Sequence, residues 1–191
     1  MVVLILGIVV FVAAHGFSTF REARAQAIGL VGLGVFKTLH ALVSLIGLVL
    51  IVWGFHLYRQ TGWIQLWTPA PWTRHAAMLL MWFAFVALAC SNPAPGRIRG
   101  WLRHPMLVAV KIWALAHLLA NGDFGGVVLF GSLLAWAVYD RIAVKRRGDA
   151  GAPRLAAFTR ADAIDLAVGT VLYGAMLVLH PYVIGVAVLG G

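Results

Sequence analysis

The chain alternates long hydrophobic stretches with short polar segments. An α-helix needs about 20 mainly apolar residues to cross the hydrocarbon core of a bilayer. Six stretches qualify or nearly qualify, at roughly 1–20, 38–58, 75–92, 104–121, 124–141 and 164–188. The pattern therefore predicts an all-α fold, a polytopic membrane helical bundle with about six transmembrane helices.

No stretch has the composition of a soluble domain or of a low-complexity linker, so residues 1–191 are predicted to form a single transmembrane domain. The first hydrophobic stretch lacks the positively charged start of a secretory signal. In addition, His15 follows the small residues that would have to form the cleavage site. We therefore expect this stretch to be a retained span.

Composition supports the assignment to the membrane. The chain is 62% hydrophobic and only 11% charged, with a mean hydropathy of +0.93, which is far more apolar than a soluble domain. In a soluble protein the net charge of +9 would suggest nucleic-acid binding. Here the basic residues lie in the predicted loops, where they anchor the chain and contact anionic lipid. We expect the lipid bilayer, and no nucleic acid, as a partner.

The distribution of basic residues predicts the orientation. The first, third and fifth connections contain Arg21, Arg24, Lys37, Arg97, Arg99, Arg103, Arg141, Lys145, Arg146, Arg147, Arg154 and Arg160. The second connection has only Arg59 and Arg74. Because cytoplasmic loops retain positive charge, both termini are predicted to be non-cytoplasmic.

Seven histidines are the unusual polar feature of this apolar chain. Acidic residues are few, and none is clearly in the middle of a span. The one cysteine, Cys90, excludes iron–sulfur clusters and multi-cysteine metal sites. Imidazoles without carboxylate or thiolate ligands indicate haem, held by one or two axial histidines from facing helices. The alternative, that each histidine is a hydrogen-bonded packing residue, stays open.

The histidines differ as candidate ligands. His40, His75 and His104 lie near the ends of predicted spans, where interfacial, capping or lipid-phosphate roles explain them. The stronger candidates are His15, His56, His117 and His180. Counting helix rise from the predicted cytoplasmic boundaries places His117 and His180 at similar depth, about 20 and about 22 Å along their spans.

The segment 103–123 concentrates the polar groups of the chain. Its sequence, RHPMLVAVKIWALAHLLANGD, opens with a basic turn and closes on a helix-stopping Asn-Gly-Asp. Pro105 suits a helix start because its missing N–H would be unpaired there, and Asp123 is expected to cap a helix. Lys111 and His117 lie inside the predicted span, where titratable groups are costly and usually face the protein interior. This segment is therefore the first place to look for function.

The same segment, with HGF after the first span, FHLYRQTGWIQLW after the second and LHPYV in the last, resembles the NnrU family of bacterial membrane proteins. It also resembles the related 15-cis-zeta-carotene isomerase of plants and cyanobacteria. The NnrU resemblance implies a bacterial inner-membrane protein associated with denitrification, with nitric oxide or a nitric-oxide reductase as a partner. The isomerase resemblance implies haem b and a carotenoid, an apolar polyene, as substrate.

The isomerase resemblance also implies roles for individual residues. It makes His15 and His117 the axial ligands of haem b, and it matches His56 and His180 to further histidines of the enzyme. The depth count instead makes His180 the rival axial ligand. At one position the chain departs from the isomerase, because Ala114 replaces a proposed cysteine ligand. A ligand switch through that thiolate is therefore not available here.

Three functions remain as hypotheses, in this order. The first is a haem b protein in redox or nitric-oxide metabolism. The second is a cofactor-free membrane assembly factor in which the histidines pack and hydrogen-bond. The third is a haem-dependent cis–trans isomerase of a carotenoid, placed last because of Ala114. The sequence predicts no catalytic residue, and it leaves open whether the chain is an enzyme, either an isomerase or an oxidoreductase.

Overall fold

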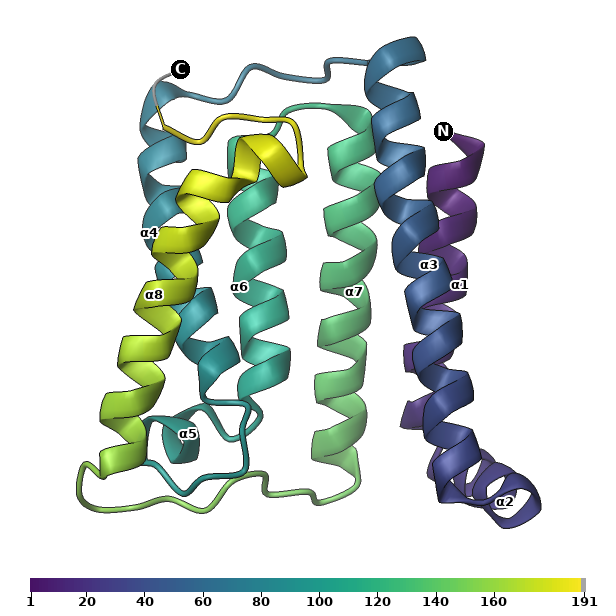
Figure 1. The fold of residues 1–191 in the computed structure, drawn as a ribbon, viewed down its shortest axis with the longest axis vertical. Coiled ribbons are helices and arrows are strands. Elements are labelled where there is room, and N and C mark those ends of the chain that lie inside the picture. Colours follow the sequence, from purple (N-terminus) through teal and green to yellow (C-terminus); the bar gives the residue numbers. More distant parts are fainter. Residues whose placement is uncertain (190–191) are drawn as a thin grey trace. The chain divides into compact units, whose positions relative to one another are not determined.

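The computed structural model describes residues 1–189, which fold almost entirely into α-helices (Figure 1). The helices of this described part are α1 (Val2–Thr19), α2 (Arg21–Val31), α3 (Leu33–Thr61), α4 (Pro71–Ala89), α5 (Arg97–Leu102), α6 (Pro105–Ala120), α7 (Phe124–Arg146) and α8 (Arg160–Val183). Extended pairing among these residues is limited to an isolated bridge between Gln65 and Asp123. The predicted all-α fold is confirmed.

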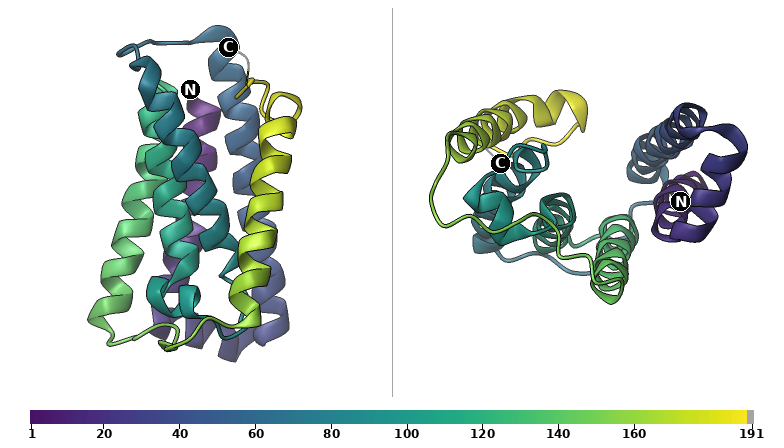
Figure 2. Two further views of the ribbon diagram at one scale, coloured as in Figure 1. Left: turned by 90° about the vertical axis from the view of Figure 1, so that its left-hand side faces the viewer. Right: turned by 90° about the horizontal axis from the view of Figure 1, so that it is seen from below.

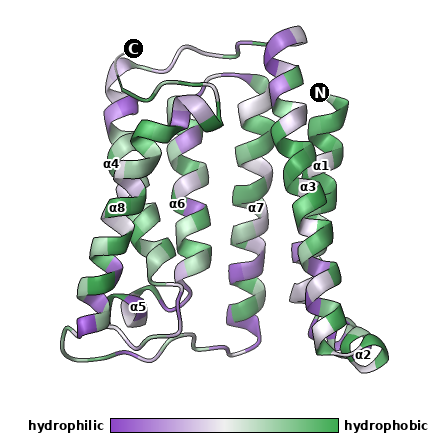
Figure 3. Cartoon of the chain, in the orientation of Figure 1, coloured by the Kyte–Doolittle hydropathy of each residue, from purple (hydrophilic) through white to green (hydrophobic). Residues whose placement is uncertain are grey.

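Helices occupy all six predicted spans. Among the described residues, α1, α3, α4, α7 and α8 are long and apolar enough to cross a membrane, while α6 is shorter, with 16 residues. Hydrophobic residues predominate along α1 and α3 (Figure 3). Only 11% of the apolar window of α3, and 11% of that of α8, is buried inside the protein. Because most of this apolar surface faces outward, lipid must cover it, and the chain is a multi-pass membrane protein.

Two segments that were expected to be loops are helical, namely α2 and α5. α2 is rich in Ala, Arg, Glu and Gln, which have high helix propensity without being apolar. It ends at Gly32, whose φ of 83° lies in the left-handed region that glycine adopts readily. α8 begins before the predicted residue 164, because Thr159 and Asp162 form a capping box at its start.

The chain divides into two compact units. The first comprises Met1–Thr68 and Asn121–Arg147, with α1, α2, α3 and α7. The second comprises Pro69–Ala120 and the described residues from Gly148 onward, with α4, α5, α6 and α8. Each unit therefore combines two segments that are distant in the sequence.

In the first unit, α1 and α3 lie side by side in close backbone contact (Figures 1 and 2). A Cβ atom added at Gly47 would lie 2.8 Å from the backbone nitrogen of Phe11, and one at Gly7 would lie 2.6 Å from that of Ile51. Small residues of this kind allow membrane helices to approach closely, and van der Waals packing then holds the pair together. The contact sets which residues of α1 face α3.

The start of α7 is tied to the second connection. The carboxylate of Asp123 accepts a hydrogen bond from the backbone N–H of Gly126 at 2.7 Å, which confirms the predicted cap. The carbonyl of Gly122 accepts from the N–H groups of Leu66 and Trp67 at 2.7 and 3.0 Å. These bonds hold the two distant segments of the first unit together at this end.

In the second unit, α8 is anchored through the fully buried Asp162. Its carboxylate accepts hydrogen bonds from the backbone N–H groups of Arg97 and Ile98, at 2.9 and 2.7 Å, and from that of Thr159 at 2.8 Å. One carboxylate therefore caps both α5 and α8. α6 begins at Pro105, as predicted, and packs against α4, which in turn packs against α8.

Candidate histidine sites in the membrane helices

His15 lies in the last turns of α1, in the first unit. Its Nδ1 donates a hydrogen bond to the carbonyl of Phe11, one turn earlier, at 2.8 Å. The ring also stacks on the Phe11 ring, with centroids 4.1 Å apart. Since a carbonyl only accepts, the Nδ1 atom carries the proton in this arrangement, and the lone pair of the neutral ring is on Nε2.

Two further polar rings contact that of His15. The ring of His40, on α3, lies 5.2 Å from it, and the ring of Trp136, on α7, lies 5.3 Å from it, both edge-on. The Nε2 atom of His40 and the Nε1 atom of Trp136 are buried and have no hydrogen-bond partner within residues 1–189. One turn beyond His15, the hydroxyl of Thr19 donates to the carboxylate of Asp140 at 2.8 Å. The first unit thus gathers polar groups from three helices around His15.

His117 lies in the last turn of α6, in the second unit. Its Nδ1 donates to the carbonyl of Trp113 at 2.8 Å, and its ring lies 5.0 Å from the indole ring of the same residue. This is the arrangement found at His15, in which the carbonyl one turn earlier in the helix takes the Nδ1 proton. It orients the imidazole and assigns the lone pair of the neutral ring to Nε2.

His180 lies in the last turn of α8, immediately before Pro181. Its Nδ1 donates to the carbonyl of Val186 at 2.7 Å, which follows the end of the helix. His180 belongs to the same unit as His117. His15 belongs to the other unit, and the choice between His15 and His180 as the partner of His117 stays a prediction.

The other histidines have different surroundings. His56 is exposed on α3, and its Nε2 accepts a hydrogen bond from the amide of Gln60 at 3.0 Å. His75 is exposed near the start of α4. His104 precedes α6, and its buried Nε2 has no partner in the described part of the chain. Among the described residues, none of these three histidines shows the bond from Nδ1 to a backbone carbonyl that His15, His117 and His180 make.

Thiolate and multi-residue metal ligation find no support in the described residues. Ala114 is fully buried, one turn before His117, and it offers no thiolate. The single cysteine, Cys90, lies at the end of α4 and is also fully buried. Residues 1–189 contain no group of three or more His, Cys, Asp or Glu side chains placed to hold a metal ion. An axial haem site needs only one or two imidazoles, so this finding leaves the histidine candidates in place.

The structure adds His40 to the residues near a candidate ligand, although the sequence analysis ranked it as a weak candidate. The interfacial position of His40 stays a prediction, but its ring contacts that of His15 and its Nε2 is buried. The sequence did contain a signal, because both histidines lie close to the first basic connection, on either side of it. Residues on either side of the connection between two adjacent spans lie at similar depth along the two helices.

The helices and their outward apolar surface define the class of this protein, a multi-pass α-helical membrane protein with histidines on several of its helices. The sequence pattern of one family, described as NnrU protein, matches residues 3–188. The chain therefore belongs to the NnrU family. No curated protein matches it, and no solved structure does.

Proposed function

We propose that this chain is a haem b protein of the bacterial inner membrane that serves redox or nitric-oxide metabolism associated with denitrification. One observation carries the proposal. In His15, His117 and His180 the Nδ1 atom donates to a backbone carbonyl, at 2.8, 2.8 and 2.7 Å. Metal-ligating histidines commonly show this bond, which fixes the tautomer, orients the ring and raises the basicity of Nε2.

The histidines have the chemistry that a haem needs from its protein ligands. Haem iron takes neutral imidazole nitrogen as a ligand, and three apolar helices carry an imidazole whose Nδ1 is committed to a backbone carbonyl. Polar groups inside a membrane helix are costly and usually functional, which argues against three such histidines as packing residues alone. A haem held there would supply one-electron redox chemistry and an iron to which nitric oxide could bind.

The chain's own residues set the conditions for that chemistry. The carbonyls of Phe11 and Trp113 hold the two imidazoles against rotation, so that Nε2 keeps one direction. The buried Trp136 Nε1–H can donate a hydrogen bond to a group beside His15. The apolar side chains of the spans exclude water, which strengthens each of these polar contacts.

The residues that we propose would hold the haem are His15 and His117, as the family resemblance implies, and His180 is the rival of His15. We do not assign a role in coordination to His56, which is exposed and bonded to Gln60. Ala114 provides no thiolate, so the function proposed is binding and electron transfer rather than a ligand switch.

Absorption spectra of the detergent-purified protein test the proposal. Oxidised and dithionite-reduced spectra are recorded with and without added haemin, for the wild type and for His15→Ala, His117→Ala and His180→Ala. We expect the wild type to show a Soret band and, when reduced, sharp α and β bands. His117→Ala and His15→Ala should abolish the sharp bands, and His180→Ala should retain them. His75→Ala, an exposed histidine, is the control and should leave the spectrum unchanged.

Other outcomes have defined meanings. Loss of the sharp bands in His180→Ala, with retention in His15→Ala, would replace His15 by His180 as the axial partner. A protein with no Soret band after haemin addition would contradict haem binding, and the cofactor-free assembly factor would then be the better account. Addition of nitric oxide to the reduced protein tests the physiological role separately, because an unchanged spectrum would exclude binding of this gas at the iron.

A further inference from the structure

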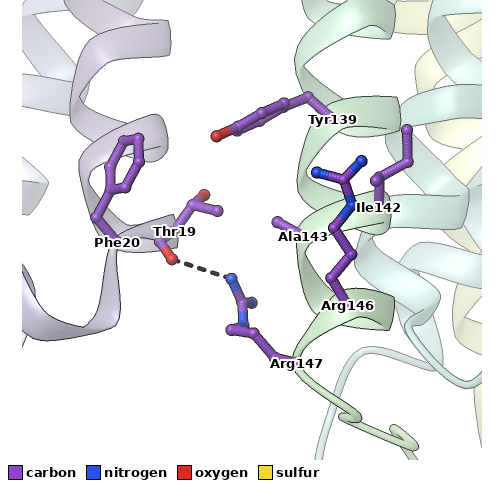
Figure 4. Close-up of a pocket in the computed structure, with 7 residues that line it drawn as sticks. All are labelled: Thr19, Phe20, Tyr139, Ile142, Ala143, Arg146 and Arg147. Carbon is purple, nitrogen blue, oxygen red and sulfur yellow. Dashed lines mark hydrogen bonds between the residues drawn. The ribbon is translucent and has the colours of Figure 1, made fainter.

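A second polar site lies at one end of the first unit, one helical turn beyond His15. A recess of about 360 Å³ lies between the end of α1 and the end of α7. On one side of the recess are Thr19, the last residue of α1, and Phe20, which follows it. On the other side are Tyr139 and Arg146 of α7, and Arg147, which follows α7 (Figure 4). We propose that this recess binds the phosphate headgroup of an anionic phospholipid.

The two arginines provide the positive charge for a phosphate. Arg147 caps the C-terminus of α7 and donates from Nη1 to the carbonyl of Thr19 at 3.0 Å, which places its guanidinium across the recess (Figure 4). A guanidinium has five N–H donors, so this bond uses only part of its capacity. Arg146 lines the same recess from an exposed position. Guanidinium groups bind phosphate oxygens through charge-assisted hydrogen bonds.

Two acidic residues stand beside the recess lining in the sequence, Asp140 next to Tyr139 and Glu22 two residues after Phe20, and they offset part of this charge. Asp140 accepts the hydroxyl of Thr19 at 2.8 Å, so its carboxylate faces α1. Further basic residues stand on both sides of the recess in the sequence, with Arg21 after Phe20 and Lys145 before Arg146. The balance at this end of the unit is therefore positive, which favours an anionic over a zwitterionic lipid.

The rest of the lining suits a lipid rather than a free ion. Phe20, Tyr139 and Ile142 are 57%, 49% and 45% exposed, so they present apolar surface beside the arginines. The recess lies where α1 and α7 end, and both helices are long and apolar enough to span a membrane. A phosphate there would have its acyl chains along the apolar flank of the helices. This combination of guanidinium, aromatic ring and aliphatic surface is what the headgroup region of a bilayer contacts.

Native mass spectrometry of the full-length protein in detergent measures the binding. Dioleoyl phosphatidylglycerol is titrated against dioleoyl phosphatidylcholine, with the wild type and the double variant Arg146→Gln/Arg147→Gln. The matched control is Arg141→Gln/Lys145→Gln, which removes the same charge from the same helix without touching the recess lining. We expect the recess variant to bind phosphatidylglycerol at least about tenfold more weakly, and the control to lose less than about twofold.

Three results would overturn the proposal. Equal losses in the two double variants would show diffuse surface charge rather than a site. Binding of phosphatidylcholine as tight as that of phosphatidylglycerol would remove the selectivity for an anionic lipid. Binding of glycerol 1-phosphate as tight as that of the lipid would assign the recess to a free phosphate.

A second variant keeps the test decisive if the loss of two arginines prevents folding. Ile142→Trp fills the recess and leaves both guanidinium groups in place. It should also weaken phosphatidylglycerol binding at least about fivefold, whereas wild-type affinity in a folded Ile142→Trp protein would contradict the site. Circular dichroism and size-exclusion chromatography establish folding. The outcome is independent of haem, because the lipid titration is performed on protein without haemin.

Discussion

The imidazole of His40, on α3, meets that of His15, on α1, edge-on, with ring centroids 5.2 Å apart and an interplanar angle of 64°. The Nδ1 of His15 is held by the carbonyl of Phe11, whereas the buried Nε2 of His40 has no hydrogen-bond partner in the described part of the chain. A buried polar atom without a partner costs about 1–3 kcal/mol. The unpaired nitrogen of His40 therefore lowers stability, and on the haem proposal a group bound beside His15 would give it a partner.

The first prediction concerns His40→Leu. In haem-free protein, removal of an unpartnered buried nitrogen should leave the free energy of unfolding unchanged or raise it by up to about 1 kcal/mol. The melting temperature should therefore stay the same or rise. In haem-loaded protein the same change should shift the Soret maximum, because it alters the surroundings of His15. Differential scanning fluorimetry and absorption spectra measure the two effects.

His56→Leu is the matched control, since His56 lies on the same helix but is exposed. It should leave the haem spectrum unchanged. A haem-free His40→Leu protein with a clearly lower melting temperature would mean that His40 serves packing, and the proposed role would be wrong.

The second prediction concerns Asp162→Asn. The carboxylate accepts four hydrogen bonds, from the N–H groups of Arg97, Ile98 and Thr159 and from the Thr159 hydroxyl. An amide of the same shape loses the charge and one acceptor oxygen, so the free energy of unfolding should fall by about 2 to 4 kcal/mol. Denaturant titration followed by circular dichroism measures it. The control Glu22→Gln changes an exposed carboxylate on α2, and an effect of similar size there would contradict the specific role of Asp162.

The third prediction tests the contact between α1 and α3. Gly47→Ala places a methyl group 2.8 Å from the backbone nitrogen of Phe11, so the two helices must separate. The expected loss of stability is about 1 to 3 kcal/mol. Gly34→Ala, on the same helix, meets nothing within 4 Å and should be neutral or stabilise by up to about 1 kcal/mol. Thermal unfolding compares the two, and equal effects would show that the helices do not pack as closely as described.

The fourth prediction concerns Cys90. Burial, with a smaller contribution from Asp165, raises the pKa of the Cys90 thiol to about 12. At pH 8 only about one molecule in 10⁴ then carries the reactive thiolate. We expect no alkylation by iodoacetamide over hours in the folded protein and full alkylation after denaturation, both measured by intact-protein mass spectrometry. Because the fold favours the neutral thiol, this contribution to stability is complete below pH 9 and is lost as the pH rises towards 12.

A cysteine introduced at an exposed position provides the control. Phe158→Cys in a Cys90→Ser background should be alkylated within minutes at pH 8, since Phe158 is 54% exposed between α7 and α8. Rapid labelling of Cys90 in the folded wild type would show that the end of α4 opens, in contradiction to the burial described.

The helical spans were predictable because hydropathy is a local property. An apolar run of sufficient length predicts a span wherever it occurs, and all six places contain a helix. α2 and α5 were missed because they are polar, and their helical state depends on propensity and on caps. The bonds from Arg97 and Ile98 to Asp162 join residues far apart in the sequence, and no local pattern indicates them.

The candidate ligands were predictable in part. His15, His117 and His180 were singled out as titratable groups in apolar segments, and in each the structure shows the same Nδ1 bond to a carbonyl. His40 was underrated because its importance rests on contact with His15 across two helices. The sequence predicted only that the basic loops contact anionic lipid, and it gave no sign of the recess at Arg146 and Arg147.

The sequence by itself determined the class of the protein, the positions of its spans and which spans carry histidines, because length, hydropathy and residue chemistry are read along the chain. Only the tertiary structure decided which side chains meet. The close approach of α1 to α3 at Gly7 and Gly47 sets the relative rotation of the helices and so places His40 against His15. Likewise, the bond from Arg147 to Thr19 brings two helix ends together to form the recess. Such contacts depend on the rotation and register of helices that are distant in the sequence, and hydropathy does not encode these quantities.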